Sequence, residues 1–373
     1  MYLGDSMKGV YIHIPFCSSI CSYCDFSKVL YKKEMVNKYM NALEKEIIGF
    51  YDNEVISTIY IGGGTPSSLD MEDLTRLFEI IKIFKLNDIY EFTFEVNVND
   101  ITEELVSFLY KNKVNRISVG VESFEEKNLK YLNRKHTKKD IFNKINILKK
   151  YFSNINIDII YALPIESYND VKSDIKNFLK LDIPHISTYS LIIEEHTVLG
   201  IKKVTPISEE EDYKMYEYIV RKLKKNEFVH YEVSNFAKPG YESEHNLNYW
   251  NNGEYYGFGL GAHGYINGVR YENTKNLTKY LKGSFKINEL FISKQEEMEN
   301  EVMLGLRKLD GINIEEFFNK YNENIQDVFN IMPLLKEKLL IIENKNLKIP
   351  EDKIYIMNEI LYKIFNKEEA CQN

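Results

Sequence analysis

Short apolar runs alternate with longer amphipathic stretches through the first half of this 373-residue chain. Six runs have the length and the β-branched or aromatic content of strands, and they cover residues 10–14, 58–61, 91–97, 116–121, 155–161 and 185–191. The stretches between them space apolar residues three and four positions apart, which predicts helices at 34–50, 70–84, 102–111, 137–151 and 168–181. Strands and helices that alternate in this way form a parallel sheet with right-handed crossovers.

This order of elements indicates an α/β fold. No G-x-G-x-x-G turn follows the first predicted strand, which favours a barrel over a dinucleotide-binding sheet. Six strand–helix units are too few for a closed eight-stranded barrel. We therefore expect an open, three-quarter (β/α)6 barrel whose chemistry lies at the carboxyl ends of its strands.

The pattern changes after about residue 195. A helix is predicted at 208–228 with Ser208 as its cap, a strand follows at 228–237, and residues 239–271 are rich in glycine and tyrosine. From about residue 294 the sequence predicts helices and a two-stranded wing around Asn344–Asn346. We divide the chain into a barrel at 1–200, a barrel extension at 201–290 and a small helical, winged-helix-like domain at 291–373.

Two carboxylates stand out within the predicted strands. Glu95 alternates with apolar residues in 91–97, and Asp158 lies opposite the isoleucines of 155–161. Both are expected to point into the mouth of the barrel, where a buried carboxylate needs a partner. A structural ion pair and a ligand contact are both open for each residue, and the pair together favours a ligand.

Composition and charge exclude several classes of protein. Hydrophobic residues form 44% of the chain and charged residues 28%, which is typical of a globular protein. No run of about 18 apolar residues predicts a membrane span, and no signal-peptide pattern opens the sequence. The net charge of −8 and the acidic balance of residues 294–373 argue against nucleic acid as a partner. The few, clustered cysteines favour the reducing cytoplasm over a disulfide scaffold.

Three of the four cysteines, Cys17, Cys21 and Cys24, lie directly after the first predicted strand, and Cys371 lies near the end of the chain. Closely spaced thiolates bind zinc or iron–sulfur clusters. A structural zinc site needs a fourth ligand, for which His13 is the nearest candidate. Three thiolates suit a four-iron cluster with one open iron. A redox-active pair of Cys21 and Cys24 is the remaining alternative, and it leaves Cys17 without a role.

The spacing C-x-x-x-C-x-x-C, with Tyr23 before the last cysteine, resembles the signature of the radical S-adenosylmethionine superfamily. The segment IYIGGGTPS at 59–67 is similar to the superfamily's glycine-rich loop. The resemblance implies a 4Fe-4S cluster on the three cysteines, S-adenosylmethionine on the open iron, and an electron donor for the cluster. The implied cofactor-binding residues are Tyr11, Tyr23, Gly63, Gly64, Thr65, Glu95, Glu122, Arg134, Asp158 and Ile192.

Glu122 departs from the pattern, because relatives commonly carry glutamine there. A carboxylate at this position would repel an anionic part of a ligand unless a cation neutralised it, and Arg134 is the candidate cation.

Across nearly the whole chain the resemblance is to the oxygen-independent coproporphyrinogen III oxidase-like family, which shares the motif YIHIPFC and a small C-terminal domain. Asp25 and Phe26 follow Cys24 where the authentic oxidases place a further cysteine, and only ten residues precede Tyr11. The motif H-N-x-x-Y-W is similar to that of the haem chaperone (HemW) branch, and its residues here are His245, Asn246, Tyr249 and Trp250.

This branch implies a protein that binds haem and delivers it to haem-dependent enzymes. His245 is the candidate haem ligand, with Tyr249 and Trp250 as flat apolar faces and His263 as a second possible ligand. A hydrogen-bonded core histidine is the competing reading of His245. The alternative function is a coproporphyrinogen III dehydrogenase that decarboxylates two propionates to vinyls. Transient contact with membrane-bound recipients is compatible with the haem chaperone hypothesis.

Overall fold

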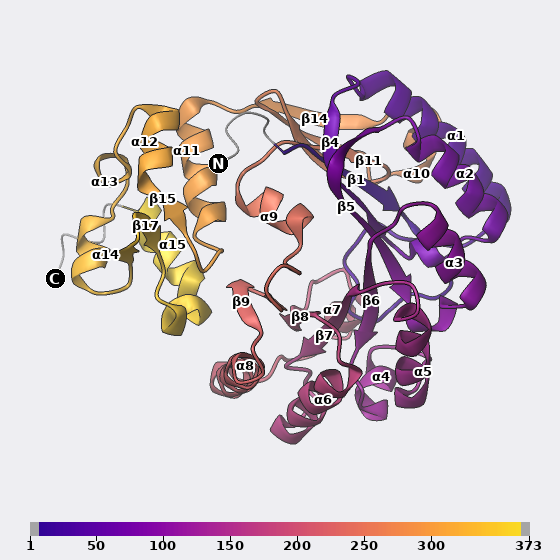
Figure 1. Cartoon of the computed structure of the whole chain (residues 1–373), viewed down its shortest axis with the longest axis horizontal. Coiled ribbons are helices and arrows are strands. Elements are labelled where there is room, and N and C mark those ends of the chain that lie inside the picture. Colours follow the sequence, from indigo (N-terminus) through magenta and orange to yellow (C-terminus); the bar gives the residue numbers. More distant parts are fainter. Residues whose placement is uncertain (1–6, 367–373) are drawn as a thin grey trace.

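The six strands predicted from the apolar pattern form the centre of a curved sheet, on whose outer side the helices pack (Figure 1). The structure is a computed structural model, and it describes residues 7–366. The central parallel strands are β1 (Gly9–Ile14), β4 (Val55–Gly63), β5 (Lys85–Asn97), β6 (Arg116–Glu122), β7 (Asn154–Tyr161) and β8 (His185–Ser190). The helices that follow them are α1 (Lys33–Phe50), α2 (Met71–Ile81), α3 (Glu103–Lys111), α4 (Glu126–Tyr131), α5 (Lys138–Leu148), α6 (Tyr168–Leu181), α7 (Val198–Ile201) and α8 (Glu209–Lys224).

Helix starts coincide with capping residues in the sequence. Asp70 accepts a hydrogen bond from the Asp73 backbone at the start of α2, and Thr137 forms a capping box with Asp140 at the start of α5. Ser208 caps α8 as the sequence predicts. Each cap satisfies backbone N–H groups that the first turn of a helix leaves without partners.

The sheet is larger than the predicted barrel. Its twelve strands run in the order β14-β13-β12-β11-β1-β4-β5-β6-β7-β8-β10-β9, with antiparallel strands at both edges. The added strands are β9 (Val229–Glu232), β10 (Asn235–Ala237), β11 (Tyr255–Phe258), β12 (His263–Ile266), β13 (Val269–Asn273) and β14 (Lys286–Phe291). The ends of this sheet, β9 and β14, do not pair with each other, so the barrel is open as predicted.

Two local predictions need correction. Residues 228–237 form two antiparallel strands, β9 and β10, and not one, because the chain reverses at Val233 and Ser234. The region 239–271 contains helix α9 (Glu244–Trp250) and three strands, none of which the sequence pattern indicated. Helix α10 (Leu277–Leu281) and the short parallel pair β2 (Phe16–Cys17) and β3 (Val29–Leu30) complete this part of the chain.

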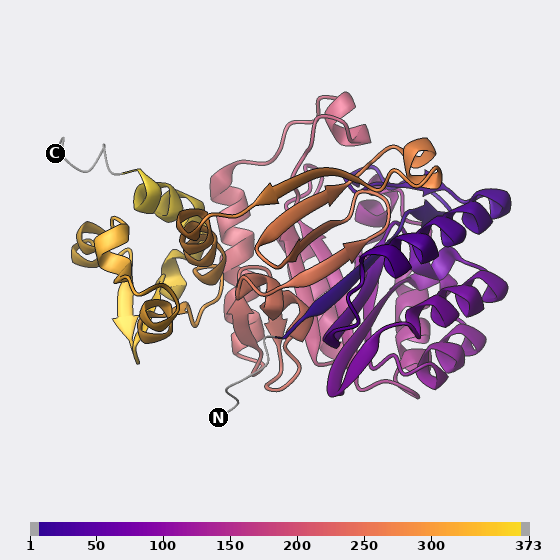
Figure 2. The same cartoon turned by 90° about the horizontal axis from the view of Figure 1, so that it is seen from above.

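The C-terminal residues form a separate lobe beside the sheet (Figure 2). Its elements are α11 (Lys294–Gly305), β15 (Ile312–Asn313), α12 (Ile314–Tyr321), α13 (Ile325–Val328), α14 (Met332–Lys336), β16 (Ile341–Glu343), β17 (Asn346–Lys348) and α15 (Met357–Phe365). The wing predicted around Asn344–Asn346 is the β16–β17 hairpin, to which β15 adds a third strand. None of the described helices combines the length and apolar content needed to cross a membrane.

Candidate cofactor site

Alternation along the central strands decides which side chains face the inside of the curved sheet. In β5, Phe92 and Phe94 pack outward against Phe78 of α2, with ring centroids 5.8 and 6.0 Å apart. The intervening polar residues therefore face inward. The same alternation in β6 and β7 places Ser118 and Asp158 on the inner face, so parallel strands deliver a polar lining to one side of the sheet.

Most of the predicted cofactor residues line a single cavity of about 450 Å³ on this inner side. They are Cys17, Cys21, Tyr23, Cys24, Gly63, Gly64, Thr65, Glu95, Glu122, Arg134, Asp158 and Ile192. These residues come from positions far apart in the chain, and the parallel order of the strands brings them together.

The cysteine loop lies at the mouth of this cavity and is fastened to neighbouring elements. The Ser22 hydroxyl donates to the Tyr131 carbonyl at 2.7 Å, and the backbone N–H of Leu199 donates to the Ser22 carbonyl at 3.1 Å. Burial raises the pKa of the Cys17 thiol to about 11 and also raises the pKa of Cys21. Metal binding by such thiols requires release of their protons. Cys371 lies outside the described residues.

The arrangement of the cysteines bears on the kind of metal group. Within residues 7–366 no three His, Cys, Asp or Glu side chains are grouped so as to hold a single ion. Three soft sulfur donors at one cavity fit a multi-iron cluster, in which each thiolate binds a different iron.

Glycines bring backbone close to the cysteines and carboxylates. A Cβ at Gly64 would lie 2.7 Å from the Pro15 carbonyl and 2.9 Å from Cys17 Sγ. Gly63 has a φ of +120°, a conformation that side chains other than glycine's rarely adopt. The loop after β4 therefore depends on glycine for its close approach to the cysteine loop.

Two buried carboxylates give the cavity its acidic character. Burial raises the pKa of Glu95 to about 7, although the Tyr60 hydroxyl donates to it at 2.7 Å. Burial, followed by the charge of Glu122, raises the pKa of Asp158 to about 6. Because burial penalises the ionised forms, a cationic ligand would stabilise both carboxylates.

Glu122 is neutralised as the sequence predicts, because it forms an ion pair with Arg134. Arg134 also donates to Asn97 Oδ1 at 2.7 Å and to the Tyr23 hydroxyl at 3.0 Å. The guanidinium thus joins the cysteine loop to β5 and β6.

The remaining predicted residues lie outside the cavity lining. The Tyr11 hydroxyl contacts His13 Nδ1 at 3.0 Å. His245 is only 1% exposed, with Nδ1 hydrogen-bonded to Thr58 Oγ1 at 2.8 Å and Nε2 to the Tyr249 hydroxyl at 2.7 Å. In this geometry His245 is a hydrogen-bonded core residue, and ligation of iron by either ring nitrogen would require the loss of one of these hydrogen bonds.

Trp250 and His263 also lie apart from the cavity. The Trp250 ring packs against Arg307 of the C-terminal domain, whose guanidinium carbon lies 5.7 Å from the ring centroid. His263 is exposed on β12. The structure therefore does not gather the H-N-x-x-Y-W aromatics around the cysteines.

Sequence reasoning did not assign several other lining residues to the cavity, among them Tyr60, Asn97, Arg116 and Asn246. Asn97 shares the polar face with Glu95, so alternation alone could have identified it. Arg116 is a charged residue at the start of a buried strand, which is a detectable signal. Asn246 depends on the position of α9, which no local pattern indicated.

The open parallel sheet, the three thiols after its first strand and the glycine loop after the second define the class of radical S-adenosylmethionine proteins. Comparisons with known proteins agree. Residues 11–178 match the radical SAM superfamily, and residues 292–352 match the HemN C-terminal domain.

Two relatives illustrate the family. A protein of Lactococcus lactis named heme chaperone HemW is 42% identical over 369 residues, covering 95% of this chain and 97% of its own length. A Bacillus subtilis protein of the same name is 39% identical, covering 90% of this chain and 93% of its own. The chain therefore belongs to the radical SAM superfamily and, within it, to the family of heme chaperone HemW proteins.

The fold itself has a solved counterpart. The coproporphyrinogen III oxidase HemN of Escherichia coli superposes with a TM-score of 0.85 at 20% identity, covering 96% of this chain and 90% of that one. At this identity the similarity shows that the fold is shared.

Proposed function

We propose that this protein is a haem chaperone on a radical S-adenosylmethionine scaffold: it binds a 4Fe-4S cluster, S-adenosylmethionine and haem, and delivers haem to haem-dependent enzymes. The observation that carries the proposal is 42% identity over 95% of the chain to a protein named heme chaperone HemW. The gathering of the three cysteines at one cavity supports the cluster.

In this proposal Cys17, Cys21 and Cys24 hold the cluster. The backbone of Gly63 and Gly64 allows close approach of a ligand. Glu95 and Asp158 stabilise the positive charges of S-adenosylmethionine, for which their buried position is suited.

Cluster and S-adenosylmethionine, when bound, supply one-electron chemistry at the open iron. The chain's own residues bind and orient these groups. Arg134 holds Glu122 neutralised and keeps Tyr23 in place beside the cysteines.

The proposal also includes partners and a compartment. Recipient haem enzymes, some of them membrane-bound and contacted transiently, would accept the cargo, and an electron donor would reduce the cluster. We place the protein in the cytoplasm, because a cluster on thiols requires a reducing environment.

The test is an anaerobic reconstitution with iron and sulfide, followed by a haem titration monitored at the Soret band and transfer to an apo-haem enzyme. Cys17→Ala, Cys21→Ala and Cys24→Ala are each expected to lose the cluster, whereas Cys371→Ala, the control, retains it. Retained iron and sulfide in any of the first three variants would contradict the cluster assignment.

The same sample, supplied with coproporphyrinogen III, S-adenosylmethionine and a reductant, distinguishes the alternative. Stoichiometric haem binding and transfer without decarboxylation support the chaperone. Formation of protoporphyrinogen without haem binding would instead identify a coproporphyrinogen III dehydrogenase.

A further inference from the structure

The cavity extends from the cysteines past Asp158 to a polar end, where Asn156 and Ser118 donate to Asp158 at 2.9 and 3.4 Å. This inner end is lined by Arg116, Ser118, Asn156, Ser187 and Asn246. Arg116 is the first residue of β6, whereas Glu122, beside the cysteines, is the last. The cavity therefore follows the inner face of β6 along its length, which is on the order of 20 Å for seven residues.

Arg116 is a buried cation with little hydrogen bonding. It is 1% exposed, and the only hydrogen bond of its side chain within residues 7–366 runs from Nη1 to Thr93 Oγ1 at 3.5 Å. Its Nε is buried without a hydrogen-bond partner there. A guanidinium has five N–H donors, so most of this donor capacity is left for a ligand.

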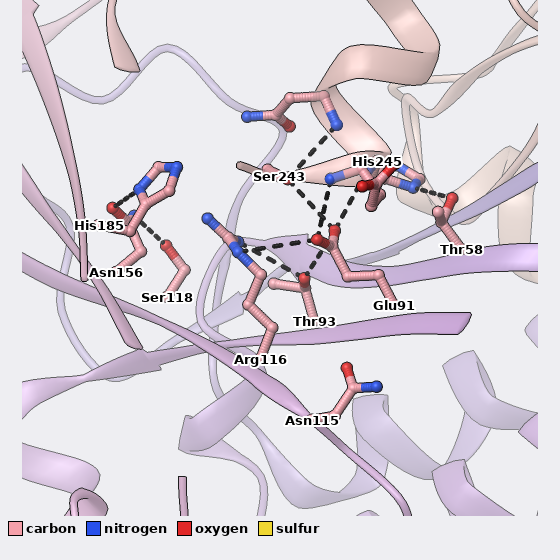
Figure 3. Close-up of polar contacts among 12 residues, drawn as sticks. Thr58, Glu91, Thr93, Asn115, Arg116, Ser118, Asn156, His185, Ser243 and His245 are labelled. Atoms are coloured by element: carbon pink, nitrogen blue, oxygen red, sulfur yellow. Dashed lines mark hydrogen bonds and ion pairs between the residues drawn. The ribbon is translucent and has the colours of Figure 1, made fainter. Parts of the chain in front are cut away.

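The nearest carboxylate does not use that capacity. Glu91 lies 3.9 Å from Arg116 Nε, and its oxygens accept hydrogen bonds from the start of α9: from the Ser243 hydroxyl at 3.2 Å and from the backbone N–H groups of Glu244 at 2.9 Å and His245 at 3.1 Å. Figure 3 shows Arg116 between Glu91 on one side and the Asn156–His185 pair on the other. The start of α9 supplies hydrogen bonds to Glu91. Arg116 has Glu91 as a counterion but makes no hydrogen bond with it.

Helix α9 presents one residue of the H-N-x-x-Y-W motif to the cavity, and that residue is Asn246. His245 fastens the helix through Thr58 and Tyr249, as described above. The Asn246 side chain lines the cavity and makes no hydrogen bond with any other residue of the described chain. The motif thus supplies a free amide at the same end of the cavity as Arg116.

We propose that Arg116 and Asn246 form a carboxylate-binding site, and that it receives a propionate of haem. This assignment rests on the proposed haem cargo, and because Arg116 lines the same cavity as Glu95 and Asp158, haem and S-adenosylmethionine would occupy the cavity in turn. A carboxylate can accept paired N–H donors from a guanidinium and a further one from an amide, which gives Arg116 the partner that it lacks. His245, held by Thr58 and Tyr249, acts through α9 as a positioning residue for Asn246.

The other end of the cavity suits the remainder of the ligand. Phe26 and Ile192 line the mouth and are 66% and 72% exposed. These apolar side chains offer a surface for a flat macrocycle, while a cavity of about 450 Å³ has room for only part of one. Glu95 and Asp158 make the middle of the cavity unfavourable for an anion, whereas Arg116 at the inner end offers a carboxylate a buried cation with unused donors.

The experiment compares haem with its dimethyl ester, which lacks both anionic carboxylates, in Soret titrations of the full-length protein. The wild type is expected to bind haem about tenfold or more tightly than the ester. Asn246→Asp keeps the size of the side chain and adds a negative charge. It is expected to lower the affinity for haem about tenfold without changing the affinity for the ester. Arg116→Lys keeps the positive charge but loses the paired N–H donors of the guanidinium, and it should also lower the affinity for haem.

The matched control is Asn251→Asp, at the exposed C-terminal end of the same helix, which should titrate like the wild type. Equal affinities of the wild type for haem and ester, or unchanged haem binding in Asn246→Asp, would overturn the carboxylate site while leaving the chaperone function standing. Failure of the wild type to bind haem at all would overturn both. Weakened S-adenosylmethionine binding with unchanged haem binding in Asn246→Asp and Arg116→Lys would also overturn it, because the carboxylate would then belong to the cofactor.

Discussion

The Glu122–Arg134 ion pair shows how one residue can depart from a family pattern without disrupting the site. Glu122 is 5% exposed and lies in the left-handed region with a φ of +68°, where β6 carries an irregularity between Gly120 and Glu122. A buried carboxylate in such a place needs a cation. Arg134 supplies it, and its further bonds to Asn97 and Tyr23 make the pair part of the cofactor site.

Arg134→Met is expected to lower the free energy of unfolding by about 3 kcal/mol, because it leaves the Glu122 carboxylate buried without a counterion. Adding Glu122→Gln in the same chain should recover about 1 kcal/mol or more, since the uncompensated charge is then removed. Urea denaturation of the two variants measures both values. A double variant less stable than Arg134→Met would show that Glu122 does not depend on this arginine.

His245 allows a test based on pH. Burial, followed by the charge of Arg116, lowers its pKa to about 3, so the folded protein keeps the imidazole neutral while the unfolded chain takes up a proton below about pH 6.5. The stability that neutral His245 contributes is therefore fully present above pH 6.5 and is lost as the pH falls toward 3.

His245→Gln should be less stable than the wild type at pH 8 by about 1–3 kcal/mol, because the Thr58 and Tyr249 hydroxyls lose a partner. This difference should shrink by about 1.4 kcal/mol for each pH unit below about 6.5, since glutamine does not titrate. Urea denaturation at pH 8, 6 and 5 measures it. His263→Gln, at an exposed position on β12, is the control and should differ from the wild type by less than about 0.5 kcal/mol at every pH. A gap that stays constant with pH would contradict a buried, neutral His245.

At the same scale, the sequence predicted the cavity better at strand ends than on α9. Cys17, Glu95 and Asp158 were found because spacing and alternation are local signals. Asn246 was recognised only as part of the H-N-x-x-Y-W motif, because its place in the cavity depends on contacts between α9 and the distant residues Thr58 and Glu91. Such contacts join positions more than 150 residues apart and leave no periodic trace in the sequence.

At the scale of elements, the glycine loop after β4 determines where the cysteine loop lies. Gly64→Ala places a methyl group within 2.9 Å of both the Pro15 carbonyl and Cys17 Sγ, so one loop must move. Iron and sulfide bound after reconstitution are expected to fall severalfold, with an unchanged far-ultraviolet circular dichroism spectrum. Gly49→Ala, on α1, meets no atom within 4 Å and is the control. Full cluster loading in Gly64→Ala would show that the glycine loop does not determine the position of the cysteines.

Exposure and distant pairing are two reasons why the sequence missed some strands. The central strands have buried apolar faces, which produce the alternation that was recognised. Strand β14 is exposed along nearly its whole length. Its apolar residues Ile287 and Phe291 face solvent, so their pattern does not indicate a buried face. Strand β11 pairs in parallel with β1, almost 250 residues earlier in the chain, and that partner cannot be read from a local window.

At the scale of the whole molecule, the described chain contains two large, separate apolar cores. One is built on the sheet and its helices, from Val10 to Tyr280, and the other lies within the C-terminal domain, from Met298 to Ile364. Backbone hydrogen bonds join the two parts, from Val233 N–H to the Arg307 carbonyl and from Leu309 N–H to the Tyr231 carbonyl, each at 3.1 Å. Tyr355 also packs against Tyr213, with ring centroids 4.9 Å apart, but the two apolar cores remain separate, which indicates two units of folding.

Thermal unfolding followed by calorimetry is therefore expected to show two transitions, the smaller belonging to the C-terminal domain. Leu347→Ala removes a fully buried side chain from that domain and should lower the midpoint of the smaller transition, at a cost of about 2–5 kcal/mol. Ile117→Ala removes an equally buried side chain from the sheet and should lower only the larger one. A shift of one common transition by both substitutions would mean that the molecule unfolds as a single cooperative unit. The contacts between Val233 and Arg307 and between Tyr231 and Leu309 would then couple the two parts strongly. In that case the boundary near residue 291 would separate two regions of the sequence but not two units of unfolding.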